Sequence, residues 1–157
     1  MPPMKSPPIE ISWQAGEPPP EPEQDALRAV LAGFLAALGY PASGLSLLLA
    51  DDAALLALNE RHRGLSAATD ILSWSYRGGG GGAPELLGEI AVSLDRVRAQ
   101  AKANGWDERT ELLRLLAHGC AHLAGYDHET ERGEREMRAV EIAMLDEAGL
   151  SGLYPDG

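Results

Sequence analysis

The chain has 157 residues, a formal net charge of −11 and one cysteine. This length predicts a single domain, the lone cysteine excludes an internal disulfide and suits a reducing compartment, and the negative charge opposes nonspecific attraction to nucleic acid. The N-terminus lacks the pattern of a signal peptide, and the most apolar run, residues 29–40, is too short to span a bilayer. We therefore expect a soluble, cytoplasmic protein without a membrane partner.

The N-terminal segment, residues 1–24, is rich in proline, with eight of the chain's 11 prolines in residues 1–22. We expect this segment to be extended and solvated. The exception is a short edge strand, because apolar and polar residues alternate in residues 9–14. A helix is predicted over residues 25–38 from the helical spacing of its apolar residues, and Gly39 would end it.

The remaining elements follow from short apolar or alternating runs, which predict strands, and from helical periodicity and capping residues, which predict helices. Strands are expected at residues 45–50, 69–76 and 88–94. Helices are expected at residues 51–63, 94–104, from 107 into the histidine-rich stretch, and 131–148. The glycine run Gly78–Gly82 predicts a mobile loop between two strands. Residues 25–150 are expected to form one domain, followed by a tail of residues 151–157.

Three of the four histidines lie in the stretch AHGCAHLAGYDHE, residues 117–129. His118 and His122 are four residues apart, so on a helix they lie one turn from each other on the same face. Gly125 can end the helix and turn the chain, which would bring His128 back toward the other two. Three imidazoles with a fourth position left to water are the ligand set of a catalytic zinc site, so this pattern predicts Zn²⁺ binding.

Four further residues carry groups that could ligate or assist a metal ion. Cys120 lies about 160° round the helix axis from both helical histidines and is predicted to be a small buried residue. Glu111 falls on the histidine face but roughly 10 Å along the axis, so it is not expected to be a ligand. Asp127 could orient a ligand or cap a turn, and both roles stay open. His62 is predicted to be a surface residue.

The spacing HxxxHxxGxxH also occurs in a large class of zinc proteases, where the residue after the first histidine is the glutamate general base. Here that residue is Gly119, so peptide hydrolysis would lack its base. Zinc alone can still polarise a phosphoryl oxygen and lower the pKa of bound water toward about 7. A phosphodiester with a neighbouring hydroxyl is therefore the better substrate, and a metalloprotease remains the alternative.

Three blocks of the sequence resemble the YbeY endoribonucleases. The segment HGCAHLAGYDH, residues 118–128, is similar to the family signature HGxLHLxGYDH and differs at Ala121. The segments LNERHRGLSAATDILSW and LGEIAVSLDRV are similar to the family's LNxxYRGxxxPTDVLSFP and LGDIxIS, and the similarity runs from about residue 45 to 150. The other departures concern local loop shape: His62, Ala68, Trp74 and Ser75 replace tyrosine, proline, phenylalanine and proline.

The resemblance implies an α+β fold with a small mixed four-stranded sheet, about five flanking helices and a zincin-like histidine helix. It implies that residues 25–150 form a zinc-dependent, single-strand-specific endoribonuclease domain that acts in 16S ribosomal RNA maturation and ribosome quality control. The zinc ligands would be His118, His122 and His128, and the catalytic residues would be Arg63 and His118. The implied partners are single-stranded ribosomal RNA, ribosomal small-subunit proteins and a ribosome-associated GTPase.

Arg63 can also be argued from its position at the end of a predicted helix, before Gly64. A guanidinium there could project into a cleft beside the metal, although a solvated helix-end arginine is the alternative. Besides the nuclease and the metalloprotease, a third function stays open: a non-catalytic ribosome-assembly factor whose zinc only holds the C-terminal helices together.

Overall fold

The computed structural model describes residues 9–65, 69–77 and 84–154. Within these ranges four strands form one sheet in the order β1-β2-β4-β3, where β1 is Ile9–Trp13, β2 Gly44–Ala50, β3 Ile71–Ser75 and β4 Leu86–Ser93. β1 pairs with β2 and β2 with β4 in parallel, whereas β3 runs antiparallel to β4. The small mixed sheet is therefore confirmed, and the Pro-rich segment contributes its edge strand β1.

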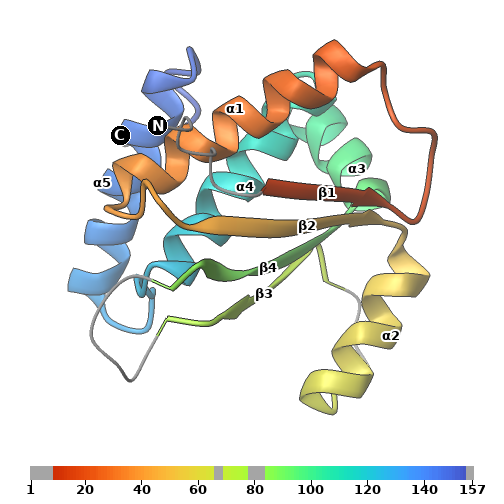
Figure 1. Ribbon diagram of the computed structural model, residues 1–157, viewed down its shortest axis with the longest axis horizontal. Helices are drawn as coiled ribbons and strands as arrows, with labels where there is room; N and C mark the ends of the chain where they lie inside the picture. The colour runs from red at the N-terminus through yellow and green to blue at the C-terminus, as the bar shows by residue number, and fades with distance from the viewer. Residues whose placement is uncertain (1–8, 66–68, 78–83, 155–157) are drawn as a thin grey trace, which may run out of the picture.

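Five helices complete the α+β fold: α1 Glu21–Ala37, α2 Asp52–Arg63, α3 Leu94–Asn104, α4 Glu108–Leu123 and α5 Glu131–Glu147. α4 packs on β3 and β4 from one side of the sheet, while α2 packs on the same two strands from the other side (Figure 1). α5 contacts α4 and α1. Among the helices of the described residues, none combines the length and apolar character needed to cross a bilayer.

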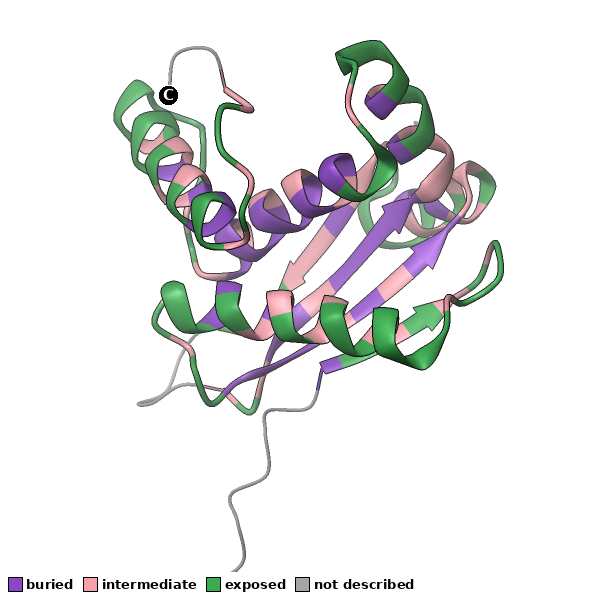
Figure 2. Cartoon of the chain, turned by 90° about the horizontal axis from the view of Figure 1, so that it is seen from above, coloured by how far each residue is buried: buried purple, intermediate pink, exposed green. Residues whose placement is uncertain are grey.

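The main hydrophobic core lies between the sheet and helices α1, α4 and α5. Fully buried leucines dominate it, including Leu31, Leu47, Leu113, Leu116 and Leu123. Buried residues gather on the strands and on the inner faces of the helices, as Figure 2 shows. α4 is therefore held between the sheet and α5, which fixes the orientation of the side chains on its remaining face.

Two predictions about the ends of helices have different outcomes. Asp107 caps α4 as expected, because its carboxylate accepts a hydrogen bond of 2.7 Å from the Thr110 backbone N–H. α1 begins at Glu21, not at Asp25, so the expectation of an extended chain up to residue 24 is wrong. Pro22 is tolerated in the first turn, where its missing N–H removes no helical hydrogen bond, and the acidic residues beside it favour the positive end of the helix dipole.

The predicted glycine loop and the predicted C-terminal tail remain to be compared with the structure. The predicted loop at Gly78–Gly82 lies outside the described residues. In the predicted tail, Leu153 and Tyr154 pack against the main core, and the Arg138 guanidinium lies 4.5 Å from the centre of the Tyr154 ring. Part of the tail is thus joined to α5 through a cation–π contact.

Candidate metal centre

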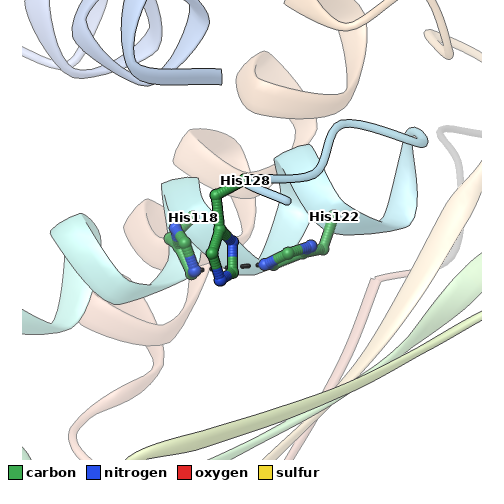
Figure 3. Close-up of side chains that lie close together, drawn as sticks. All are labelled: His118, His122 and His128. Atoms are coloured by element: carbon green, nitrogen blue, oxygen red, sulfur yellow. Dashed lines mark hydrogen bonds between the residues drawn. The ribbon is translucent and has the colours of Figure 1, made fainter. Parts of the chain in front are cut away.

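The end of α4 brings the three predicted histidines together. His118 and His122 are half-buried on one side of the helix. The Gly125 N–H donates to the His122 carbonyl at 3.0 Å, and the Tyr126 N–H donates to the Ala121 carbonyl at 3.0 Å. These two bonds form the helix-ending motif that requires a left-handed residue, and Gly125 supplies it with φ of +103°. The chain then reverses, so that His128 points at the other two imidazoles (Figure 3).

The spacing of the imidazole nitrogens fits one metal ion. One nitrogen from each of the three rings lies within 4.8 Å of the others. The Nε2 atoms of His118 and His122 are 3.2 Å apart, close to the roughly 3.3 Å that separates two nitrogen ligands of a tetrahedral zinc ion with bonds of about 2.0 Å. His128 is exposed, so the third nitrogen comes from the solvent side. The cluster could therefore hold a metal ion.

A buried glutamate on α5 orients the first histidine. Glu141 is only 4% exposed, and its Oε1 lies 2.6 Å from Nδ1 of His118. A carboxylate can only accept, so Nδ1 carries the proton and Nε2 keeps its lone pair toward the other histidines. Metal-binding histidines commonly have such a carboxylate partner. The sequence carries a signal for this residue, because Glu141 interrupts the apolar stripe of α5 between Met137 and Met144.

The surroundings of His122 favour its neutral imidazole. Burial lowers the pKa of His122, and the neighbouring rings of His118 and His128 lower it further because two imidazolium ions would repel each other. A neutral imidazole is the form that binds a metal ion.

The four other residues considered as metal ligands or helpers do not belong to the histidine cluster. Cys120 is fully buried in the core, and burial raises the pKa of its thiol to about 12. Glu111 is also fully buried, but its carboxylate accepts hydrogen bonds from Gln100, Trp106 and Arg114. The exposed Asp127 accepts from the Glu129 N–H at 3.2 Å, which is the turn-capping role. His62 is exposed and packs edge-on against Trp74.

A cavity of about 470 Å³ adjoins the histidines and contains the predicted arginine. Arg63 lies exposed at the end of α2, and its Nη2 donates to the Ser73 carbonyl of β3 at 3.0 Å. Three polar residues that were not predicted as site residues also line this cavity: Asp70, Ser73 and Ser75. Residues 71, 73 and 75 reach it because alternate residues of a strand face the same side, a consequence of pairing that needed the position of β3.

Gly119 lies where α4 approaches the sheet. A Cβ atom built on Gly119 would be 2.9 Å from Cδ1 of Ile71 and 3.0 Å from Cδ1 of Ile90. Small shifts of these methyl groups could admit a methyl, whereas a longer side chain would have to displace them further or extend into the histidine cavity, which Gly119 also lines. The position at which zinc proteases carry their general base is thus used for packing.

Fold and site together define a class of protein: an α+β domain whose histidine helix could hold a metal ion beside a polar cavity. A family model, Endoribonuclease YbeY, matches residues 19–149. The chain therefore belongs to the YbeY endoribonuclease family.

Individual relatives agree with this assignment. "Endoribonuclease YbeY" of Anaeromyxobacter sp. (strain Fw109-5) is 41% identical over 80% of this chain, and the match spans 65% of the relative's length. "Endoribonuclease YbeY" of Desulfitobacterium hafniense (strain Y51) is 35% identical over 90% of this chain and 98% of the relative. The solution structure of TM1509 from Thermotoga maritima has a TM-score of 0.56 and 21% identity, covers 88% of this chain and 90% of its own, and supports the fold alone.

Proposed function

We propose that the protein is a zinc-dependent endoribonuclease that cleaves single-stranded RNA in the cytoplasm. Its substrates are precursors of 16S ribosomal RNA, and its partners are ribosomal small-subunit proteins and a ribosome-associated GTPase. One observation carries the proposal: three converging imidazoles share a cavity with Arg63 in a chain of the YbeY endoribonuclease family.

His118, His122 and His128 would hold the zinc ion. Such an ion supplies Lewis acidity toward a phosphoryl oxygen. Among the described residues the cluster contains three ligand side chains, and the nearest thiol, Cys120, is buried and protonated. Three protein ligands are typical of catalytic zinc sites and four of structural ones. This count favours an enzyme over an assembly factor with a purely structural metal.

Arg63 and Asp70 have complementary roles at the phosphodiester. The Arg63 guanidinium, held at the Ser73 carbonyl, binds the phosphate and stabilises the negative charge that develops on its oxygens. Among the described residues that line the cavity, Asp70 supplies the carboxylate. We assign Asp70 the role of general base, which accepts the proton of the attacking hydroxyl and which sequence alone did not assign.

The metalloprotease alternative is disfavoured by the packing of α4. A protease of the HxxxHxxGxxH type needs its glutamate beside the first histidine, and the methyl groups of Ile71 and Ile90 occupy that space next to Gly119. The phosphodiester reaction does not require a base at this position, because the nucleophile can be served from the β3 side of the cavity.

The test compares purified wild type with His118→Ala and Arg63→Ala on a single-stranded RNA and on a duplex of the same sequence. We expect wild type to cleave only the single strand, chelator to abolish and zinc to restore the activity, and both variants to lose it. Arg61→Ala is the matched control, because Arg61 is an exposed arginine on the same helix. Equal cleavage by wild type and His118→Ala would refute the proposal, and so would zinc-dependent cleavage of casein without cleavage of RNA.

A further inference from the structure

Arg77 follows β3 and has no carboxylate partner among the described residues. Five other arginines form ion pairs with carboxylates: Arg28, Arg96, Arg98, Arg114 and Arg132. Within residues 9–65, 69–77 and 84–154, neither Arg77 nor Arg63 has a carboxylate partner. Four more arginines, Arg61, Arg109, Arg135 and Arg138, also show no ion pair with a carboxylate of the described residues. Arg63 and Arg77 differ from these four in their position near the histidines, where a guanidinium can meet an anion from outside.

The position of Arg77 relates it to the histidine cavity. Ile71, Ser73 and Ser75 of β3 line that cavity, and Arg77 follows two residues beyond Ser75 without itself lining it. Its guanidinium lies on Gly125, because a Cβ atom built there would be 2.5 Å from Cζ and 3.0 Å from Nε of Arg77. The cation therefore rests on the turn that returns the chain to His128.

The backbone around Arg77 is fixed to α4. The Ser75 hydroxyl donates to the Leu123 carbonyl at 2.8 Å, and the Arg77 N–H donates to the same hydroxyl oxygen at 3.2 Å. These bonds attach the end of β3 to the end of α4. Gly125 leaves room for the guanidinium because it has no side chain. The charge is therefore pre-positioned, which reduces the entropy lost when a ligand binds.

We propose that Arg77 binds a phosphate that neighbours the scissile one, so that the cleft takes a strand with at least two phosphates. This inference rests on the proposed function. The Arg63 guanidinium lines the cavity and is held at the Ser73 carbonyl of β3. The Arg77 guanidinium lies beside the cavity, on the turn after α4, so the two are placed for two different anions of one strand. The planar fork of arginine suits such contacts. An RNA strand supplies phosphates at regular intervals, whereas a mononucleotide or an isolated phosphate does not.

The binding test uses a short single-stranded 2′-O-methyl oligoribonucleotide, which keeps the phosphates but lacks the attacking hydroxyl. We expect Arg77→Gln to weaken binding roughly tenfold, the lower end for a hydrogen bond to a charged group. The slope of log K against log salt should become shallower by about 0.7, the value for one phosphate contact with a single strand. Arg77→Lys keeps the charge and should keep most of the slope.

Arg109→Gln is the matched control. Arg109 is an exposed arginine in the first turn of α4, it lines a separate cavity, and it lies nine residues before His118, roughly 13 Å along the axis. It should bind with the affinity and salt dependence of wild type. The zinc content and thermal unfolding of all variants show whether the turn at Gly125 is intact.

The cleavage test compares an oligoribonucleotide with a dinucleoside monophosphate, which has a single phosphate. Arg77→Gln should lower kcat/KM about tenfold on the oligomer and leave the dinucleoside unaffected. Equal losses on both substrates, or an Arg77→Lys variant that behaves like Arg77→Gln, would overturn the inference. If wild type binds no RNA, the proposed function fails as well; if wild type binds and Arg77→Gln matches it, only the second phosphate site fails.

Discussion

The contact between Glu141 and His118 offers the sharpest prediction about the metal site. Replacing Glu141 by glutamine keeps the volume of the side chain and an oxygen that can accept from Nδ1 of His118, but it removes the negative charge. Replacing it by alanine removes the acceptor as well. Because the carboxylate is 4% exposed and its oxygen is 2.6 Å from the imidazole, water does not easily replace it.

The expected magnitude follows from what such a carboxylate does for a metal ligand. Loss of a hydrogen-bond partner to a metal-binding histidine typically weakens metal affinity by about 10- to 100-fold. We expect Glu141→Gln at the lower end, since the orientation of the ring is retained and only its basicity falls. Glu141→Ala should lie at the upper end, roughly 2.7 kcal/mol of binding free energy, because the ring of His118 is also released.

The assay is competition between the protein and a chromophoric zinc chelator, with the unfolding midpoint in urea measured in parallel. Glu111→Gln is the control, because Glu111 is another buried carboxylate on the histidine helix α4, and its hydrogen-bond partners are not histidines. It should lower stability and leave zinc affinity unchanged. Folded Glu141→Ala protein with wild-type zinc affinity would show that this hydrogen bond does not support metal binding.

Three further predictions concern packing and ionisation. Gly119→Glu should cost about 1 to 3 kcal/mol in urea unfolding, because its Cβ would be 2.9 Å from the Ile71 methyl group and the contact between α4 and the sheet would have to repack; a wild-type midpoint would contradict this. Cys120 should react with a thiol reagent at pH 8 only after unfolding, because burial raises its pKa to about 12; rapid labelling of the folded protein would count against it. Burial opposes ionisation of Glu111, but hydrogen bonds from Arg114 and other donors outweigh burial and lower the pKa of this carboxyl. The contribution of Glu111 to the stability of the fold is therefore present above about pH 4.3, and it is lost as the pH falls through the lowered pKa of the folded state. The stability gap between wild type and Glu111→Gln, about 3 kcal/mol at pH 7, should therefore close in acid; a constant gap would contradict this assignment.

Local chemistry made most elements predictable. Residues 94–104 form a helix as predicted, and the final helix begins at Glu131 as predicted, because each starts after a residue that can cap it. The start of α1 lies before the predicted residue, because proline breaks the interior of a helix but is compatible with its first turn. The assignment of His118, His122 and His128 as metal ligands and of Arg63 as a catalytic residue remains a prediction for the metal-binding and cleavage assays.

The sequence by itself determined the features that depend on spacing along one chain: the shared face of His118 and His122, the helix end at Gly125, and the family signature. Only the tertiary structure decided the features that join distant segments. Glu141 meets His118 from another helix, and the isoleucines that crowd position 119 come from two strands. The periodicity of the sequence predicts the face of a helix or strand on which a side chain lies. The residue that this side chain contacts depends on how the helices and strands pack together.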